Sequence, residues 1–392
     1  MNGGIGFGVF SLDGDDPRVG FRVGNGVLDL AAAGLGDVFE ATSLNPFLAL
    51  GRSVWENTLT RIDRLVTRGA EFVPLEQATT HLPFVVGDYL DFYASLEHAT
   101  NLGRLFRPDA EPLLPNWRHL PVGYHGRSGT VVLSGTPVVR PCGQANVPHD
   151  TEPQFGPTRC LDIELELGFV VGVGSRLGEF VPGSAFRDHV FGVVLVNDWS
   201  ARDIQAWEYQ PLGPFLGKSF ATSISAWVTP LALLEDRFVA APLQDPEPLP
   251  YLRVSGDCAL DIELEVELSG TVVSRTNARG LYWTMPQQLA HATVNGASIA
   301  TGDLFASGTI SGSEQGSEGS LIELARNGAH PIRLGDGSTR AFLEDDDEVI
   351  LRGRAGDLEL GEVRGAILPA RCARNVSERE LLRSTTSTSS HH

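Results

Sequence analysis

Short apolar runs that end at glycine or proline recur along most of the 392-residue chain. Clear examples are GTVVLSGTPVV at 129–139, FGVVLV at 191–196 and DEVILRG at 347–353. Runs of this length between turn-forming residues are typical of β-strands, and 44 glycines and 24 prolines provide many such turns. The pattern predicts a mainly β protein with a few helices, of the α+β class.

Apolar residues recur at intervals of three and four in a small number of segments, which we expect to be helices. The longest is 41–68, and the shorter ones are SARDIQAWEY at 200–209 and TMPQQLAHATVNG at 284–296. Thr284 is expected to cap the last helix, because a threonine hydroxyl accepts hydrogen bonds from the free N–H groups at a helix start.

The order of these elements predicts two domains. A small unit of short strands and one helix occupies residues 1–83, and HLPFVVGDYLDFY then opens a larger β-rich domain over 84–373. Residues 374–392 lack a core-forming pattern, so we expect a disordered tail there.

Three carboxylates alternate with apolar residues in CLDIELELG at 160–168, namely Asp162, Glu164 and Glu166. Alternate side chains of a strand lie on one face about 7 Å apart, where like charges repel unless water or a cation separates them. DIELEVEL at 261–268 nearly repeats the pattern. The alternation alone leaves two interpretations open, a metal site or the solvated face of a sheet.

Two further acids, Asp91 and Asp198, stand at the ends of apolar runs, where a hard cation could find oxygen ligands. Asp198 is followed by Arg202 and Gln205 at intervals of four and three. All three share a helical face if the helix starts early, and only Arg202 and Gln205 do so if it starts at Ser200. The spacing fits a site that stabilises an oxyanion, and it fits a surface ion pair equally well.

Lys218, His98 and His125 are candidates for a catalytic role. Lys218 lies in LGPFLGKSFATS, whose spacing does not fit a phosphate-binding loop, and it suits the stabilisation of a developing negative charge. His98 and His125 are alternative general bases, each of which needs an acid from elsewhere in the chain. The glycine- and serine-rich stretch 306–325, which carries Glu323, is typical of a loop that shapes a site.

Composition narrows the classes of function. A hydrophobic content of 42% with 20% charged residues is typical of a globular protein, and a formal charge of −19 disfavours nucleic acid and anionic membranes as partners. No apolar run reaches about 18 residues and no signal-peptide pattern is visible, so we expect a cytoplasmic protein without a transmembrane helix. We expect the four cysteines, at 142, 160, 258 and 372, to be reduced and to form no zinc site and no disulfide framework.

Several long segments resemble the fumarylacetoacetase family in sequence and in order. They include DYLDFYASLEHATNLGRLFR, LPNWRHLPVGYHGR, LDIELELGF, VNDWSARDIQAWEYQPLGPFLGKSF, YWTMPQQLAHATVNG and ASGTISG. The resemblance implies a small N-terminal SH3-like barrel and a large C-terminal mixed β-sandwich roll. It also implies metal-dependent hydrolysis of the C–C bond of 4-fumarylacetoacetate to fumarate and acetoacetate, the last step of tyrosine and phenylalanine catabolism.

The resemblance also implies roles for particular residues. A divalent cation, usually Ca²⁺ with Mg²⁺ as an alternative or companion, would be held by Asp91, Glu164, Glu166 and Asp198. A second cation site beside the first would use Lys218 and Thr222. His98 corresponds to the general base and Glu323 to the carboxylate that orients it. Negative charge would be stabilised by Arg202, Gln205 and Lys218. The substrate-binding positions correspond to Tyr93, Arg107, Tyr124, Arg202, Gln205, Tyr209 and Thr309.

The two acidic strands then differ in their expected roles. By the resemblance, Glu164 and Glu166 are metal ligands, and the acids of 261–268 form a solvated face of the sheet. Asp162 is expected either at the rim of the site or bonded to a structural partner. A homodimer that acts on a small dicarboxylate diketone is implied. The alternatives are a related hydrolase of acylpyruvates or other β-diketones, and a cation-binding scaffold without catalysis.

Overall fold

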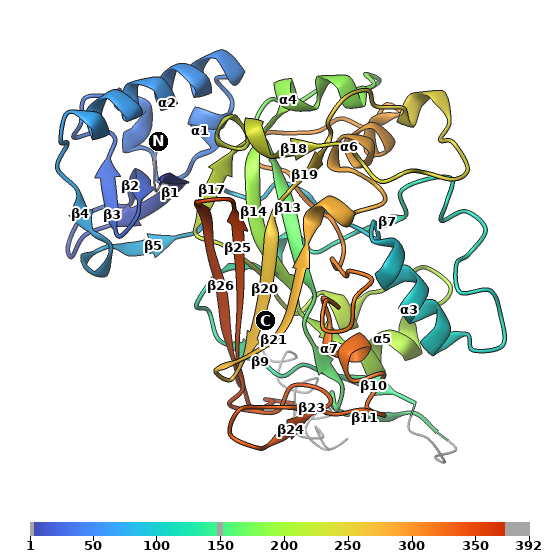
Figure 1. The fold of residues 1–392 in the computed structure, drawn as a ribbon. Helices are drawn as coiled ribbons and strands as arrows, with labels where there is room; N and C mark the ends of the chain where they lie inside the picture. Colours follow the sequence, from blue (N-terminus) through green and yellow to red (C-terminus); the bar gives the residue numbers. More distant parts are fainter. Residues whose placement is uncertain (1–3, 147–151, 373–392) are drawn as a thin grey trace, which may run out of the picture.

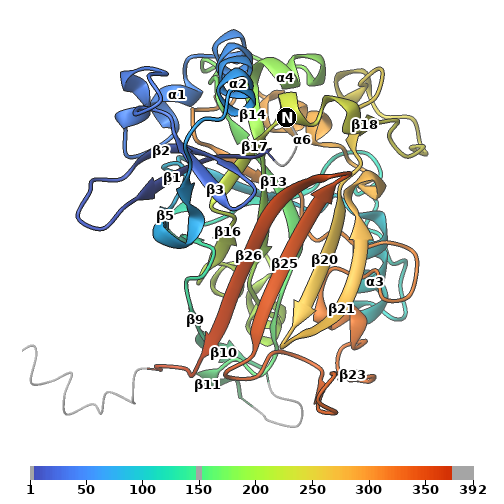
Figure 2. The same cartoon turned by 60° about the vertical axis from the view of Figure 1, so that its left-hand side comes forward.

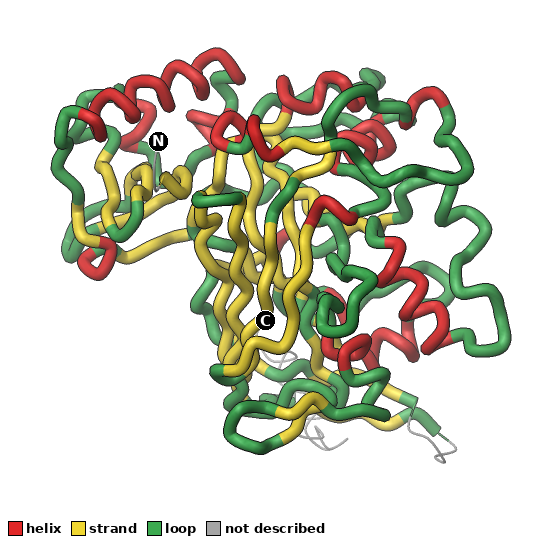
Figure 3. Tube along the Cα trace, in the orientation of Figure 1, coloured by secondary structure: helices red, strands yellow, loops and turns green. Residues whose placement is uncertain are grey.

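The computed structural model describes residues 4–146 and 152–372. Strands occupy the centre of the molecule and most helices lie at its periphery (Figures 1 and 3). The expectation of a mainly β protein of the α+β class is therefore confirmed. The predicted tail at 374–392 lies outside the described residues.

The main sheet contains thirteen strands. Its path runs through β4 (Val73–Pro74), β3 (Gly26–Asp29), β2 (Arg18–Val23), β1 (Gly4–Ser11), β17 (Trp227–Pro230), β14 (Val190–Asp198), β13 (Leu165–Val171), β22 (Leu304–Ala306), β6 (Tyr89–Phe92) and β7 (Gly123–His125). Beside this path, β5 (Thr79–His81) pairs with β1, and β16 (Thr222–Ile224) pairs with β14 and with β8 (Val131–Leu133). The central strands β13 and β14 are buried along their whole length, which accounts for their nearly continuous apolar sequences.

A second sheet of five strands packs against the main sheet and faces forward in Figure 2. Its order is β21 (Thr271–Asn277), β20 (Glu263–Leu268), β25 (Glu348–Ala355), β26 (Leu358–Leu368) and β9 (Val138–Val139). The two sheets approach closely at Gly365, where a Cβ atom would lie only 2.6 Å from the ring of Trp199. On β20 the acids point outward, and Glu263 and Glu267 pair with Arg354 and Arg352, as expected for an outer face.

Four two-stranded ribbons complete the β structure of the described residues. They pair β10 (Cys142–Ala145) with β11 (Gln154–Pro157), β12 (Leu161–Asp162) with β15 (Ser200–Ala201), β18 (Phe238–Val239) with β19 (Ala259–Leu260), and β23 (Ile332–Arg333) with β24 (Thr339–Arg340). The second of these ribbons matters for function because β12 ends just before the acidic strand β13.

The three predicted helical segments all contain helices. The segment 41–68 holds α1 (Asn45–Leu48) and α2 (Arg52–Thr67), which are interrupted where Gly51 adopts a positive φ of 85°. The other two are α5 (Arg202–Glu208) and α6 (Met285–Thr293). Gln287 of α6 accepts a hydrogen bond from the backbone N–H of Thr284, which completes a capping box at the predicted cap.

Three helices were not predicted. They are α3 (Leu96–Phe106), α4 (Phe186–His189) and α7 (Leu321–Leu324), and α3 and α7 contact each other. No helix in the described ranges is long and apolar enough to span a bilayer.

The N-terminal unit shares its sheet with the rest of the chain. Strand β1 pairs with β17, with Phe7 opposite Val228. The rings of Phe7 and Phe47 pack with Phe191 of β14 at centroid distances of 5.5 and 5.7 Å. The domain boundary at residue 83 stays a prediction, and the packing joins its two sides through one apolar core.

The structure corrects one expectation about the cysteines. Cys142 of β10 and Cys372, which follows β26, form a disulfide. The sequence suggested no such pair because 230 residues separate the two, and only the fold brings the end of β26 next to β10. Cys160 and Cys258 are free, as expected.

Candidate metal centre and active site

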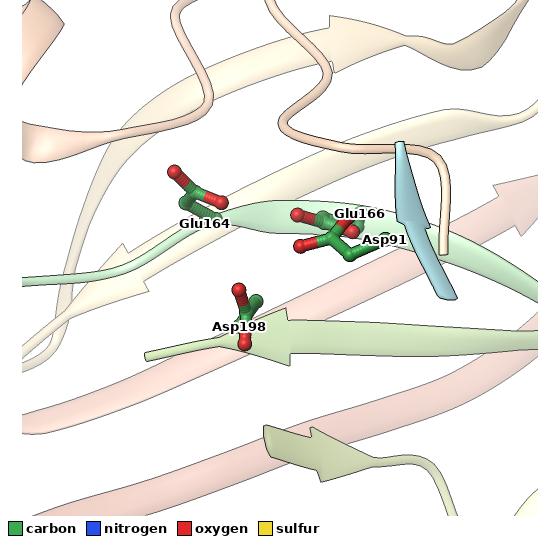
Figure 4. Close-up of side chains that lie close together, drawn as sticks. All are labelled: Asp91, Glu164, Glu166 and Asp198. Carbon is green, nitrogen blue, oxygen red and sulfur yellow. The ribbon is translucent and has the colours of Figure 1, made fainter. Parts of the chain in front are cut away.

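Four buried carboxylates meet at the point where three strands of the main sheet come together. They are Asp91 of β6, Glu164 directly before β13, Glu166 on β13, and Asp198 at the end of β14 (Figure 4). The antiparallel register places Glu166 opposite Val196, close to Asp198, and β22 pairs with both β13 and β6 to bring in Asp91. One oxygen from each carboxylate lies within 4.8 Å of all the others.

Two cations and two hydroxyl groups surround this cluster. Lys218 Nζ lies 2.5 Å from Glu164 Oε2 and 2.6 Å from Asp198 Oδ2, and Arg202 Nη1 lies 2.7 Å from Glu164 Oε1. Burial opposes the charge on Lys218, but Asp198 and Glu164 outweigh it and raise the Lys218 pKa above its usual value. Both cations therefore stay charged at neutral pH.

The hydroxyl groups of Tyr124 and Thr222 complete the polar surroundings of Asp198. Tyr124 donates to Asp91 Oδ2 at 2.7 Å and to Asp198 Oδ2 at 2.9 Å. Thr222 donates to Asp198 Oδ1 at 2.8 Å. Five of the six predicted ligands of the two cation sites therefore contact another of the six directly or through Tyr124. The sixth is Glu166, which accepts the backbone N–H of Gly308 at 3.1 Å.

The cluster fits a divalent cation. Asp91 Oδ1 and Glu166 Oε1 are buried without a hydrogen-bond partner in the described part of the chain, which is costly unless a cation binds them. Burial and the neighbouring carboxylates raise the pKa of Asp91 and of Glu166 well above the usual range. Lys218 and Arg202 supply two positive charges, and Arg202 shares its charge with Asp162, so the four carboxylates of the cluster carry an excess of negative charge that a divalent cation would offset. An all-oxygen donor set suits Ca²⁺ or Mg²⁺.

A histidine–glutamate pair adjoins the cluster. His98 and Glu323 are both buried, and the His98 Nδ1 atom lies 2.6 Å from Glu323 Oε2. Ser95 caps the start of helix α3, since its Oγ accepts the backbone N–H of His98, and this cap sets the position of the imidazole. His98 Nε2 lies 4.0 Å from Glu164 Oε1. The pair therefore faces the metal centre with the second ring nitrogen.

Glu323 is held by three side chains besides His98. Asn101 donates to its Oε1 at 3.0 Å, and Ser311 and Ser320 donate to its Oε2 at 2.9 and 2.6 Å. Burial alone would raise the pKa of Glu323, but His98 and these donors outweigh it and hold the pKa below its usual value. An ionised Glu323 fixes the imidazole with the proton on Nδ1.

The rival base His125 is not part of this arrangement. Its side chain is 78% exposed and lies 3.6 Å from Asp88 Oδ2. Among the two histidines proposed from the sequence, only His98 combines burial, an orienting carboxylate and proximity to the cluster.

Helix α5 resolves the alternatives for Asp198, Arg202 and Gln205. The helix begins at Arg202, and Asp198 ends strand β14, so the hypothesis of one helical face for all three is wrong. Arg202 and Gln205 do share a face, and Arg202 Nη1 donates to Gln205 Oε1 at 3.3 Å. The alternative of a surface ion pair between Asp198 and Arg202 is also wrong, because Arg202 is 3% exposed and pairs with Asp162 and Glu164, while Asp198 pairs with Lys218.

A cavity of about 390 Å³ opens onto the cluster. Every predicted substrate-binding residue lines it, namely Tyr93, Arg107, Tyr124, Arg202, Gln205, Tyr209 and Thr309. His98, Lys218, Asp91 and Glu164 line it as well, whereas Glu166, Asp198, Thr222 and Glu323 are not among its lining residues. The Arg107 Nε and Thr309 Oγ1 atoms are buried without partners in the described residues, so both can hydrogen-bond to a ligand.

The sequence reasoning missed several residues of the site. Asn101, Ser311 and Ser320 were not among the predicted site residues, although all three donate to Glu323. Ser320 and Glu323 form the S-x-x-E signature of a helix cap, which could have indicated Ser320. Tyr89 is a further omission. It is fully buried, and burial together with Asp198 and Asp91 raises its pKa well above the usual range.

Asp162 does not lie at a rim. It is 0% exposed and pairs with Arg202, whose Nε lies 2.8 Å from Asp162 Oδ2. Of the two possibilities that the resemblance left for this acid, the structural partner is the one found.

In this α+β fold, a buried carboxylate cluster contacts two cations, adjoins a histidine–glutamate pair and opens onto a cavity, an arrangement typical of a metal-dependent hydrolase. Two family models narrow this class. The fumarylacetoacetate hydrolase C-terminal model matches residues 89–367 and the fumarylacetoacetase N-terminal model matches residues 4–83. The chain belongs to the fumarylacetoacetase family.

Curated relatives agree with the family models. Fumarylacetoacetase of Homo sapiens is 46% identical over 397 residues, which cover 93% of this chain and 95% of the relative. Fumarylacetoacetase of Arabidopsis thaliana is 44% identical over 398 residues, with 93% and 94% covered.

Solved structures share the fold at much lower identity. A fumarylacetoacetate hydrolase from Exiguobacterium antarcticum superimposes with a TM-score of 0.55 at 17% identity and covers 94% of this chain and 100% of its own. A maleylpyruvate hydrolase from Sphingobium superimposes with a TM-score of 0.55 at 15% identity and covers 93% and 100%.

Proposed function

We propose that this chain hydrolyses 4-fumarylacetoacetate to fumarate and acetoacetate, the final step of tyrosine and phenylalanine catabolism. The observation that carries the proposal is the buried His98–Glu323 pair beside the four-carboxylate cluster at the base of the cavity. The name fumarylacetoacetase, shared by relatives that match 93% of the chain, supports the choice of substrate.

Asp91, Glu164, Glu166 and Asp198 would hold the divalent cation. When bound, the cation supplies Lewis-acid polarisation of the diketone oxygens and charge neutralisation in a site that excludes bulk water. The residues of the chain account for the remaining steps.

His98 acts as the general base. Its Nδ1 proton is donated to Glu323, so the lone pair of Nε2 is free to take a proton from a water molecule in the cavity. The water oxygen then adds to the ketone carbon of the fumaryl group. Glu323 stabilises the imidazolium that forms, and its other hydrogen bonds prevent it from turning away.

Arg202, Gln205 and Lys218 stabilise the negative charge that develops on the former carbonyl oxygen. Arg202 Nη2 is buried and has no partner in the described residues, so it can donate to this oxyanion. The carbon–carbon bond then breaks, and its electron pair stays with the acetoacetate fragment as an enolate. The enolate takes the proton back from His98, so fumarate carries the added OH and acetoacetate the added hydrogen.

The predicted substrate-binding residues offer the substrate different kinds of contact. Arg107 suits a carboxylate, because one edge of its guanidinium donates to Pro112 O at 2.6 Å and its Nε is unpartnered. Tyr93, whose ring packs edge-on against His98 at a centroid distance of 5.2 Å, limits how the substrate approaches the base. Tyr124, Tyr209 and Thr309 offer further hydroxyl groups along the cavity wall.

Calcium is the cation we propose, with magnesium as an alternative or companion. The four ligand oxygens lie within 4.8 Å of one another, a spread that Ca–O bonds of about 2.3–2.6 Å span more readily than Mg–O bonds of about 2.0–2.1 Å. Thr222, whose hydroxyl group contacts Asp198, would belong to a second, smaller cation site, and Lys218 would join it only through its backbone carbonyl oxygen, because its side chain stays a charged ammonium group. Titration of chelator-treated protein with each cation separately tests this choice, and tighter binding of Mg²⁺ than of Ca²⁺ would contradict it.

A homodimer and a cytoplasmic location are also proposals. They rest on the family resemblance. Analytical ultracentrifugation tests the dimer, and a single species with the mass of one chain, 42.1 kDa, would exclude it.

The function is tested by following the loss of diketone absorbance for fumarylacetoacetate and for an acylpyruvate. We expect faster turnover of fumarylacetoacetate, and a His98→Ala variant about 10²–10⁴-fold slower than the wild type, because it lacks the general base. The matched control is His125→Ala, which removes an exposed imidazole and should keep full activity. Equal or better turnover of the acylpyruvate would overturn the substrate, and undiminished activity of His98→Ala would overturn the base.

A further inference from the structure

Asp162 is a buried acid of the motif CLDIELELG with no role in the mechanism above. It ends the two-residue strand β12 and lies opposite Ser200 of β15. The ladder then breaks, because the carboxylate of Asp162 accepts the N–H of Ile163 at 2.8 Å, and β13 starts only at Leu165. This break separates Asp162 from the ligands Glu164 and Glu166 and turns it towards other partners.

One group of these partners is the start of helix α7. The backbone N–H of Leu321 donates to Asp162 Oδ1 at 2.7 Å, and that of Ile322 donates to Oδ2 at 3.2 Å. Both N–H groups belong to the first turn of α7, where they have no partner within the helix. Asp162 therefore anchors α7 from a distant strand, and the next residue of that helix is Glu323, which orients His98.

The other partner is Arg202. Its Nε donates to Asp162 Oδ2 at 2.8 Å, while its Nη1 bonds to Glu164. These two bonds fix the plane of the guanidinium and leave Nη2 as the buried donor without a partner. All four groups around the Asp162 carboxylate are donors, so the carboxylate accepts every bond in its ionised form.

We propose that Asp162 is a positioning residue for the hydrolysis, which holds the oxyanion donor Arg202 and the base-orienting Glu323 in register with each other. It touches neither the cavity nor the reacting atoms, and it acts through the two residues that do. The proposal rests on the proposed function, since it concerns the geometry of that reaction. Misplacement of catalytic groups by about 1 Å can cost about 10²-fold in rate, so the loss of this link should appear in kcat.

The test compares Asp162→Asn with a matched control, Asp347→Asn. Asp347 is also buried and bonds to an arginine, Arg340 Nε at 2.9 Å, and to a backbone N–H, that of Glu344 at 2.7 Å. Neither Asp347 nor these partners line the cavity. Both substitutions replace an accepting oxygen with a donating NH₂ group, so a purely structural effect should be similar in the two variants.

We expect Asp162→Asn to lower kcat about 10²-fold with a change in KM of about threefold or less, and Asp347→Asn to stay within about threefold of the wild type in both. The proton on His98 Nδ1 gives a direct readout, because its NMR resonance reports the short bond to Glu323. This resonance should shift or broaden in Asp162→Asn and stay in place in Asp347→Asn.

An Asp162→Asn enzyme with kcat within about threefold of the wild type, or one whose loss of activity equals that of Asp347→Asn, would overturn the proposal. If Asp162→Asn does not fold, Asp162→Glu decides by the same two readouts, since it keeps the charge beside Arg202 and alters the distance to Leu321. A wild type that fails to hydrolyse fumarylacetoacetate would refute the proposed function, while a displaced His98 resonance in the variant would still support the positioning role.

Discussion

Asp91, Glu164, Glu166 and Asp198 share one buried cluster, yet their surroundings differ. Burial opposes ionisation of Glu164, but Lys218 and Arg202 outweigh it and hold its pKa below the usual range. Asp91 and Glu166 bond to neither cation, and burial with the neighbouring acids raises the pKa of each. The protons that a cation must displace therefore reside on Asp91 and Glu166.

We expect the metal-free protein to lose stability as the pH rises from about 4 into the neutral range. The pKa values of Asp91 and Glu166 in the folded state lie above those of the unfolded chain, about 4, so the folded state binds more protons. This contribution to stability is complete below about pH 4 and is lost as the pH rises through the folded-state pKa values. Calcium takes the place of the protons, so the increase in melting temperature on adding Ca²⁺ should grow with pH.

Melting temperatures in chelator and in excess Ca²⁺, measured across this pH range, check the expectation. The double variant Asp91→Asn/Glu166→Gln is the control, since it should lose both the pH trend and the response to Ca²⁺. A metal-free melting temperature that is constant or rises over the range would contradict the assignment of the protons.

At the scale of elements, the acidic strand was the part of the site that the sequence could predict. Glu164 and Glu166 are close in the chain, and their alternation with apolar residues marks a strand. The proximity of Asp91 depends on the parallel pairing of β6 with β22, which no local pattern encodes. The position of Asp91 at the end of an apolar run made it a candidate, and the resemblance placed it in the same site as Glu164 and Glu166.

Helix α3 escaped prediction for a physical reason. Its buried face carries His98, Ala99, Leu102 and Gly103, so half of the positions that usually hold large apolar residues hold a histidine and a glycine. The helix stays amphipathic, but its buried face is short of large apolar side chains because that face lines the site. The break between β12 and β13 also escaped prediction. The alternation predicted one continuous strand, but Asp162 bonds to the backbone of α7 and the strand ends there.

The loop after β22 links two of the carboxylates, and Gly308 is its critical position. Gly308 has a φ of 75°, donates its N–H to Glu166 Oε2, and would place a Cβ atom 2.0 Å from the carbonyl oxygen of Phe92. We expect Gly308→Ala to separate β6 from the loop and so move Asp91 away from Glu166. Affinity for Ca²⁺ should fall about 10–100-fold, as measured by calorimetric titration.

Gly316→Ala is the control for Gly308→Ala. Gly316 has a similar φ of 81° but no atom within 4 Å of the added Cβ. Gly316→Ala therefore measures only the free-energy cost of the backbone conformation, about 1–2 kcal/mol. Calcium affinity should be unchanged in Gly316→Ala. Equal affinity in the two variants would show that the contact with Phe92 does not position the ligands.

At the scale of the whole molecule, the N-terminal unit is joined to the strands that carry the site. Phe7 of β1 is fully buried and packs edge-on against Phe21 at 4.9 Å and Phe191 at 5.5 Å. Phe191 belongs to β14, the strand that ends at Asp198. Although the family models divide the chain near residue 83, the apolar core crosses that division.

We therefore expect the N-terminal unit and the strands that carry the metal centre to unfold together in one cooperative transition. Phe7→Ala should lower the free energy of unfolding by about 3–5 kcal/mol, because it leaves a cavity in the shared core. Calorimetry should show the single transition moving to lower temperature, with the loss of Ca²⁺ binding at the same temperature. Leu50→Ala, which truncates a side chain that is 49% exposed, should leave the transition in place. Two separate transitions, of which Phe7→Ala shifts only the smaller, would instead mean that the N-terminal unit folds independently of the site.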